Sequence, residues 1–131
     1  MQKILTVPGT QKEYTEYLAT GNEYISIPSI TPKGGVEVVN VIMDKTNSLI
    51  DFRGLDLIKP FVRVNGEKMN LDEVKYHYEN SWIPNFELEN EKLKLIMKII
   101  APKGFKGFAY GITIRNNTLQ ETKIGCGVEG V

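Results

Sequence analysis

The chemistry that this sequence could carry rests first on one histidine and the carboxylates near it. His77 is the only histidine in the chain, and Glu73 and Glu79 lie close to it in the sequence. An imidazole titrates near neutral pH, so a histidine paired with a glutamate can move protons as a general acid and base. On an extended strand His77 and Glu79 would share a face, because side chains alternate from one side to the other. The spacing therefore permits a small enzyme centred on His77, although a surface or structural histidine is the commoner role.

Aromatic residues around His77 suggest a second chemistry, the binding of a sugar. One short stretch contains Tyr76, Tyr78, Trp82 and Phe86. A tryptophan offers a flat apolar face that can cover a sugar ring, while a carboxylate such as Glu79 hydrogen-bonds to the hydroxyls. Large aromatics more often fill a core, and we expect Trp82 to lie in the core. The candidate carbohydrate-binding residues are Tyr78, Trp82, His77 and Glu79.

Composition excludes several other kinds of site. With one cysteine and one histidine, the chain forms neither an internal disulfide nor a usual structural zinc site. We therefore expect no metal and no cofactor, although a calcium site built from carboxylates alone stays open. The serines also lack a nucleophile-elbow sequence such as G-x-S-x-G.

Charge and hydropathy bear on partners and location. Lysine and arginine number 16 against 16 aspartate and glutamate, so the chain lacks the basic excess that attracts nucleic acid or an anionic membrane. No apolar stretch approaches the roughly 18 residues of a membrane helix, and the first ten residues do not resemble a secretory signal. We expect a cytoplasmic protein that binds neither nucleic acid nor membrane.

The elements that must position the candidate residues read as β-strands. Residues 91–101 alternate apolar side chains with mostly lysines, which predicts a half-buried strand whose lysines protect an edge. Residues 108–115 alternate in the same way, and the loop APKGFKG should join the two runs as a hairpin. This pairing would set Ile112 and Ile114 against the apolar face of the first strand. The residues expected on that face are Leu93, Leu95, Met97 and Ile99.

Further runs rich in β-branched and aromatic residues predict more strands. They cover 23–30, 35–44, 55–64, 74–79 and 121–131. One short helix is predicted over 10–19, where Thr10 and Glu13 match a capping box. We therefore expect an all-β fold, an antiparallel two-sheet β-sandwich with at most one short helix near the N-terminus, and a single domain over residues 1–131.

The sequence also resembles a known family. The last fifty or so residues, WIPNFELENEKLKLIMKIIAPKGFKGFAYGITIRNNTLQETKIGCGVEG, resemble the N-terminal β-supersandwich domain that precedes the helical (α/α)6 barrel in glucoamylase-like and cellobiose-phosphorylase-like glycosidases. The likeness lies in the strand ending KIIAP, in the strand ITIRNNT, and in the apolar strand after that turn. The earlier GNEYISI is similar to the strand that opens such domains.

The resemblance implies a non-catalytic domain that packs on the catalytic barrel of the same polypeptide and shapes one wall of its carbohydrate site. In such enzymes the catalytic acids come from the barrel, so no catalytic residue is assigned to this chain, and residues 1–131 would be the N-terminal part of a longer glycoside hydrolase or phosphorylase. One alternative is a free-standing carbohydrate-binding module, which needs Tyr78 and Trp82 exposed on one face or in a groove. The other is the small enzyme, which needs His77 in a cleft.

Overall fold

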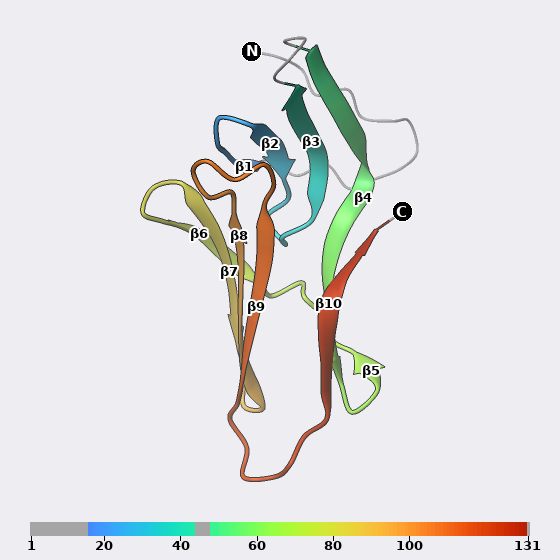
Figure 1. Ribbon diagram of the computed structural model, residues 1–131. Coiled ribbons are helices and arrows are strands. Elements are labelled where there is room, and N and C mark those ends of the chain that lie inside the picture. Colours follow the sequence, from blue (N-terminus) through green and yellow to red (C-terminus); the bar gives the residue numbers. More distant parts are fainter. Residues whose placement is uncertain (1–15, 44–47, 131) are drawn as a thin grey trace.

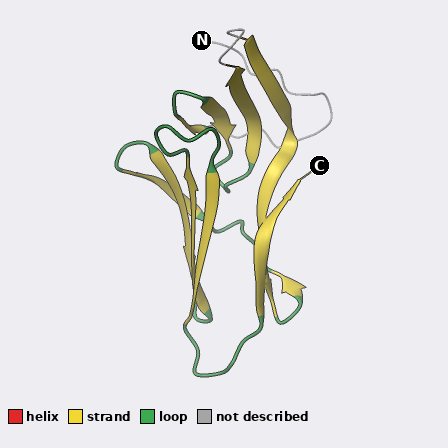
Figure 2. Cartoon of the chain, viewed as in Figure 1, coloured by secondary structure: helices red, strands yellow, loops and turns green. Residues whose placement is uncertain are grey.

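The computed structural model describes residues 16–43 and 48–130, and within these ranges it holds β-strands and no helix (Figures 1 and 2). The strands form two antiparallel sheets that pack against each other. The first sheet has the order β1-β2-β3-β4-β10, with β5 beside β4. Its strands are β1 (Leu18–Gly21), β2 (Ile25–Ile30), β3 (Val36–Met43), β4 (Ser48–Val64), β5 (Glu67–Lys68) and β10 (Ile124–Gly130).

The second sheet has the order β6-β7-β8-β9. Its strands are β6 (Lys75–Glu79), β7 (Ile83–Glu89), β8 (Leu93–Ile100) and β9 (Ala109–Asn116). The two-sheet, all-β architecture predicted from the sequence is therefore confirmed.

The core lies between the sheets and is built from alternate residues of their strands. In β8, every second side chain is buried, and the lysines point to the outer face. Leu95 lies opposite Ile114 and Met97 opposite Ile112 on β9, which confirms the predicted hairpin and its apolar face. The first sheet contributes a matching layer of buried side chains. Its members include Ile25, Ile27, Ile30, Val36, Val39 and Val62.

Two tight turns close hairpins in the two sheets, and the second of these hairpins carries the candidate residues. Asn65 and Gly66 take left-handed backbone angles (φ 51° and 87°) and join β4 to β5 as an Asn-Gly hairpin turn. Asn80 and Ser81 do the same between β6 and β7 (φ 52° and 67°). Asparagine tolerates this conformation better than most residues, because its short polar side chain hydrogen-bonds locally.

Three sequence-based expectations differ from the structure. Most of the predicted helix over 10–19 lies outside the described residues, and at its end Leu18 and Ala19 belong to strand β1. The lysine-bearing strand β8 is an inner strand with β7 and β9 on its two sides, so its lysines cover a solvated sheet face and do not guard an edge. Strand β7 was not predicted, although it lies in the middle of the second sheet.

The long strand β4 has different neighbours along its two halves. Its first half pairs with β3, from Met43 opposite Ser48 to Val38 opposite Arg53. Its second half pairs on the other side with β10, which spans Ile58 to Val64. In Figure 1 the upper parts of β3 and β4 extend past the end of the second sheet. β10 pairs with one edge of β4 only from Ile58 onward. Among the described residues, no strand pairs with that same edge of β4 in the part that precedes Ile58.

The described residues include no helix that is long and apolar enough to cross a membrane.

Candidate functional site

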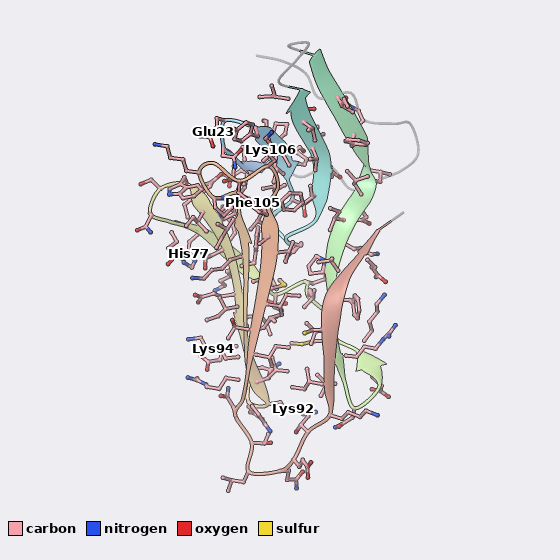
Figure 3. All side chains as sticks on the ribbon, in the orientation of Figure 1. Glu23, His77, Lys92, Lys94, Phe105 and Lys106 are labelled. Atoms are coloured by element: carbon pink, nitrogen blue, oxygen red, sulfur yellow. The ribbon has the colours of Figure 1, made fainter. Side chains whose placement is uncertain are left out.

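His77 lies on strand β6, on the outer face of the second sheet (Figure 3), and Glu79 lies on the same face two residues further along the strand. Glu79 Oε2 accepts hydrogen bonds from Lys98 Nζ (2.7 Å) and from Asn85 Nδ2 (3.2 Å). The bond from Lys98, then that from Asn85, hold the pKa of Glu79 below its usual value, and the positive charges of Lys98 and His77 add to this. Glu79 therefore stays ionised near neutral pH and is poorly suited to donate a proton. His77 is exposed on this open sheet face.

Tyr78 belongs to the opposite face of the same strand. It pairs with the buried Pro84, and its ring is 42% exposed. Its hydroxyl accepts a hydrogen bond from the backbone N–H of Ala19 at 3.0 Å. The polar tip of Tyr78 is thus engaged with β1, and only its ring is free to meet a ligand.

Trp82 follows the Asn80–Ser81 turn and is 41% exposed, so the expectation that it fills the core is wrong. The turn places it at the end of the sandwich, where the second sheet stops. Its backbone carbonyl accepts a hydrogen bond from Thr20 Oγ1 at 2.8 Å. The structure therefore brings the four candidate residues to one strand and its turn, but not to one face.

The loop between β8 and β9 adds an aromatic residue that the sequence analysis did not single out. Phe105 is 57% exposed, and the loop around it is tied to the β1–β2 turn. Asn22 Nδ2 donates to the carbonyls of Pro102 (2.6 Å) and Phe105 (2.7 Å), and Glu23 accepts from the Gly104 N–H. Figure 3 labels Phe105 and Glu23 near one another in this region. The signal available in the sequence was a phenylalanine within the predicted loop APKGFKG.

The first strand and its turn therefore brace two loops at once. Thr20 holds the carbonyl of Trp82, and Asn22 holds the loop of Phe105. These two bracing residues are two positions apart, which is about 7 Å along an extended chain. Tyr78, Trp82 and Phe105 are named here the aromatic end. It presents the half-exposed rings of one strand residue, Tyr78, and of two loop residues whose backbones are hydrogen-bonded to β1 and its turn, an arrangement suited to stacking on an apolar ring face.

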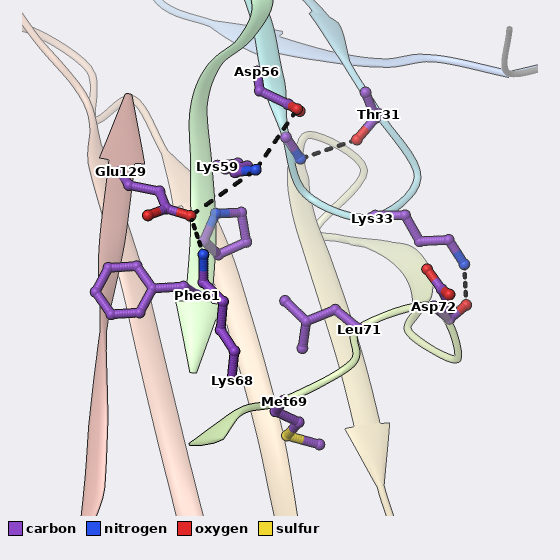
Figure 4. A pocket seen from close by; sticks show the side chains of 12 residues that line it. Thr31, Lys33, Asp56, Lys59, Phe61, Lys68, Met69, Leu71, Asp72 and Glu129 are labelled. Atoms are coloured by element: carbon purple, nitrogen blue, oxygen red, sulfur yellow. Dashed lines mark hydrogen bonds and ion pairs between the residues drawn. The ribbon is translucent and has the colours of Figure 1, made fainter. Parts of the chain in front are cut away.

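A separate hollow of about 290 Å³ opens beside β4 and the segment after β5 (Figure 4). Its floor is apolar and includes Pro60, Phe61, Met69 and Leu71. Charged side chains ring this floor, and they are largely paired with one another. Lys68 Nζ lies 2.8 Å from Glu129, and Lys59 Nζ lies 3.9 Å from both Glu129 and Asp56. Lys33 donates to the backbone carbonyl of Asp72.

These contacts determine the charge that the hollow presents to a ligand. The bond from Lys68 lowers the pKa of Glu129, as do the nearby positive charges, so this carboxylate remains ionised in its ion pairs. Lysines and carboxylates are balanced around the rim, so the hollow does not present a concentrated charge of one sign to a ligand. No group of three or more His, Cys, Asp or Glu within the described ranges is placed to hold a metal ion.

Comparison of the chain with protein-family models, with characterised proteins and with solved structures gives no match.

Proposed function

We propose that this chain is a non-catalytic β-sandwich domain of a carbohydrate-active enzyme, packed on a separate catalytic domain, and that its aromatic end forms part of the wall that meets the carbohydrate. The observation that carries the proposal is the exposure of Trp82 in the β6–β7 turn and of Tyr78 in β6, since large aromatics normally fill cores. Phe105 on the neighbouring braced loop adds a third ring. The resemblance of the last fifty residues to glycosidase supersandwich domains supports the same assignment.

The aromatic end also suits a free-standing carbohydrate-binding module, which is the second candidate. Both candidates use the same surface, so they share one binding test. The gene sequence distinguishes the two candidates, because a reading frame that continues past codon 131 into a helical-hairpin repeat favours the enzyme domain. A small enzyme centred on His77 is the less favoured reading, because Glu79 is committed to Lys98 and His77 stands on an open face.

The binding test uses the fluorescence of Trp82, which is the only tryptophan in the chain. Titration with soluble α- and β-linked gluco-oligosaccharides should change its emission in a saturable way. Phe105→Ala should weaken this binding about tenfold, as expected for loss of about 1 to 2 kcal/mol of ring contact. Phe52→Ala is the matched control, because Phe52 is an exposed phenylalanine (50%) at another part of the fold.

Two outcomes would refute the carbohydrate-facing role, and a third would favour the small enzyme. A folded protein that shows no saturable change with any of these saccharides would refute a carbohydrate-facing role for the aromatic end. Equal weakening by Phe105→Ala and Phe52→Ala would likewise show that the response does not come from this surface. Turnover of aryl-glycosides that disappears in His77→Ala would instead favour the small enzyme.

A further inference from the structure

We propose that the open edge of β4 is an interface at which a second copy of this chain adds its own β4 antiparallel, centred on Phe52. The proposal is independent of the proposed function, because it uses the edge of the first sheet opposite β1. The aromatic end, which β1 braces, stays free in such a dimer.

The backbone groups of β4 around Phe52 have alternating directions. Ile42 of β3 donates its N–H to the carbonyl of Tyr24, on the β2 side (2.9 Å). This direction alternates along a strand, so Val39 directs its N–H and C=O groups toward β4. Its partner Phe52 directs its own N–H and C=O groups back toward β3. The next residues on either side of Phe52 therefore direct their N–H and C=O groups to the open edge. Within residues 16–43 and 48–130 no strand pairs with these groups, and unpaired groups on an edge strand are a template for another strand.

An exposed apolar surface lies beside this edge. Phe52 is 50% exposed and Ile50 is 41% exposed. They lie opposite Val39 and Val41, so they share the core-facing side of the first sheet at the end that extends past the second sheet. Apolar residues along an unpaired strand edge favour association, because a second strand removes them from water.

The sequence of this edge is self-complementary. In an antiparallel pair centred on Phe52, each Asp51 lies directly opposite the Arg53 of the other copy, twice in the same interface. These are also the two residues whose backbone groups point outward, so each such pair exchanges its N–H and C=O hydrogen bonds. Phe52 then meets its own counterpart in a close pair that is not hydrogen-bonded, where side chains approach most nearly.

Charge selects this register over its neighbour. Centring the pair on Asp51 uses the same backbone groups but sets two aspartates directly opposite each other, which is unfavourable. Within one chain, Arg53 Nε already lies 2.6 Å from Asp51 Oδ2, on the outer face of the sheet. In the dimer the two pairs would form one alternating group of four charges. The two-fold symmetry makes the contact isologous and closed, so it yields a dimer and no fibre.

The experiment exploits this charge pattern with two single variants. In Asp51→Arg the edge carries two positive charges, and in Arg53→Asp it carries two negative charges. We expect the unmodified chain to dimerise with rising concentration in sedimentation velocity, and each single variant to dimerise at least about tenfold more weakly. A mixture of the two variants should associate as a heterodimer, because every cross-strand pair is then of opposite sign. The exchanged double variant D51R/R53D should dimerise like the unmodified chain.

A second measurement fixes the register and does not depend on charge. With Cys126 replaced by serine, Phe52→Cys should form a disulfide-linked dimer on mild oxidation, because the two Cα atoms of this pair would be about 4.5 Å apart. Asp51→Cys should not, because its two copies would be diagonal neighbours beyond disulfide reach. Unmodified protein that stays monomeric at all concentrations, or a mixture of variants that associates no better than either alone, would overturn the proposal. So would protection of the Asp51 amide from exchange in a monomer, which would assign the edge to another segment of the same chain.

Discussion

Replacement of Leu95 by alanine tests the packing between the sheets most directly. Leu95 is fully buried in the middle of β8, between Leu88 on β7 and Ile114 on β9. The substitution removes three carbon groups, or about 2.4 kcal/mol of transfer free energy at about 0.8 kcal/mol each. The cavity that remains adds to this, so the expected loss in the free energy of unfolding is about 2 to 5 kcal/mol. A domain of this size has about 5 to 15 kcal/mol in total, so the variant should fold but be far less stable.

The matched control is Lys94→Ala, one residue earlier on the same strand. Lys94 points to the solvated face of β8, so its replacement should cost under about 0.5 kcal/mol. Urea unfolding followed by Trp82 fluorescence and by far-ultraviolet circular dichroism measures both variants. Leu95→Ala should lower the midpoint by about 1 to 3 M, and Lys94→Ala should leave it almost unchanged. Equal shifts for the two variants would mean that the buried and solvated faces of β8 are assigned the wrong way round.

Two more predictions concern a glycine and a carboxylate. Gly34 has a left-handed φ of 91°, and a Cβ there would lie 2.5 Å from the Tyr110 hydroxyl, which donates to the Gly34 carbonyl. Gly34→Ala should therefore lower the free energy of unfolding by at least about 1 kcal/mol more than Gly66→Ala does. Gly66 is the control because its φ is similar but its surroundings are open. Equal losses of the two variants in urea unfolding would contradict this. Lys98 lowers the pKa of Glu79 in the folded protein. The ionised carboxylate therefore stabilises the fold at pH values above the ordinary glutamate pKa of about 4.3. This contribution is lost as the pH falls through the lower pKa of the folded state. Glu79→Gln should flatten the acid limb of a stability-against-pH curve and meet the unmodified curve at the lowest pH, whereas an unchanged slope would contradict the assignment.

Local alternation explains why part of the fold could be predicted. In β8 the apolar and polar residues alternate because one face meets the core and the other meets water, so the pattern is written in the strand itself. Strand β7 shows the opposite case. Pro84, Asn85 and Phe86 are all buried in succession, because Glu79 and Lys98 cover Asn85 on the outer face. Only Phe86 to Glu89 alternate between buried and more exposed side chains, and this stretch is too short to indicate the whole strand.

The candidate site, like the fold, could be predicted from the sequence only in part. The sequence placed an aromatic cluster near His77 and a pairing of His77 with Glu79 on one face, and both follow from spacing along a single strand. It did not determine the exposure of Trp82, because that depends on where the second sheet ends and on the turn at Asn80. Nor did it link this turn to the loop of Phe105.

The sequence by itself determined the strand character, the apolar face of the β8–β9 hairpin and the absence of an internal disulfide. These follow from residue type and from a period of two, which are properties of neighbouring residues. Only the tertiary structure decided that β1 and its turn hold two distant loops, and that no strand among the described residues pairs with the β10 side of the first half of β4. Both depend on contacts between residues far apart in the chain, and such contacts arise from how the sheets are ordered and how far each strand extends beyond its neighbours.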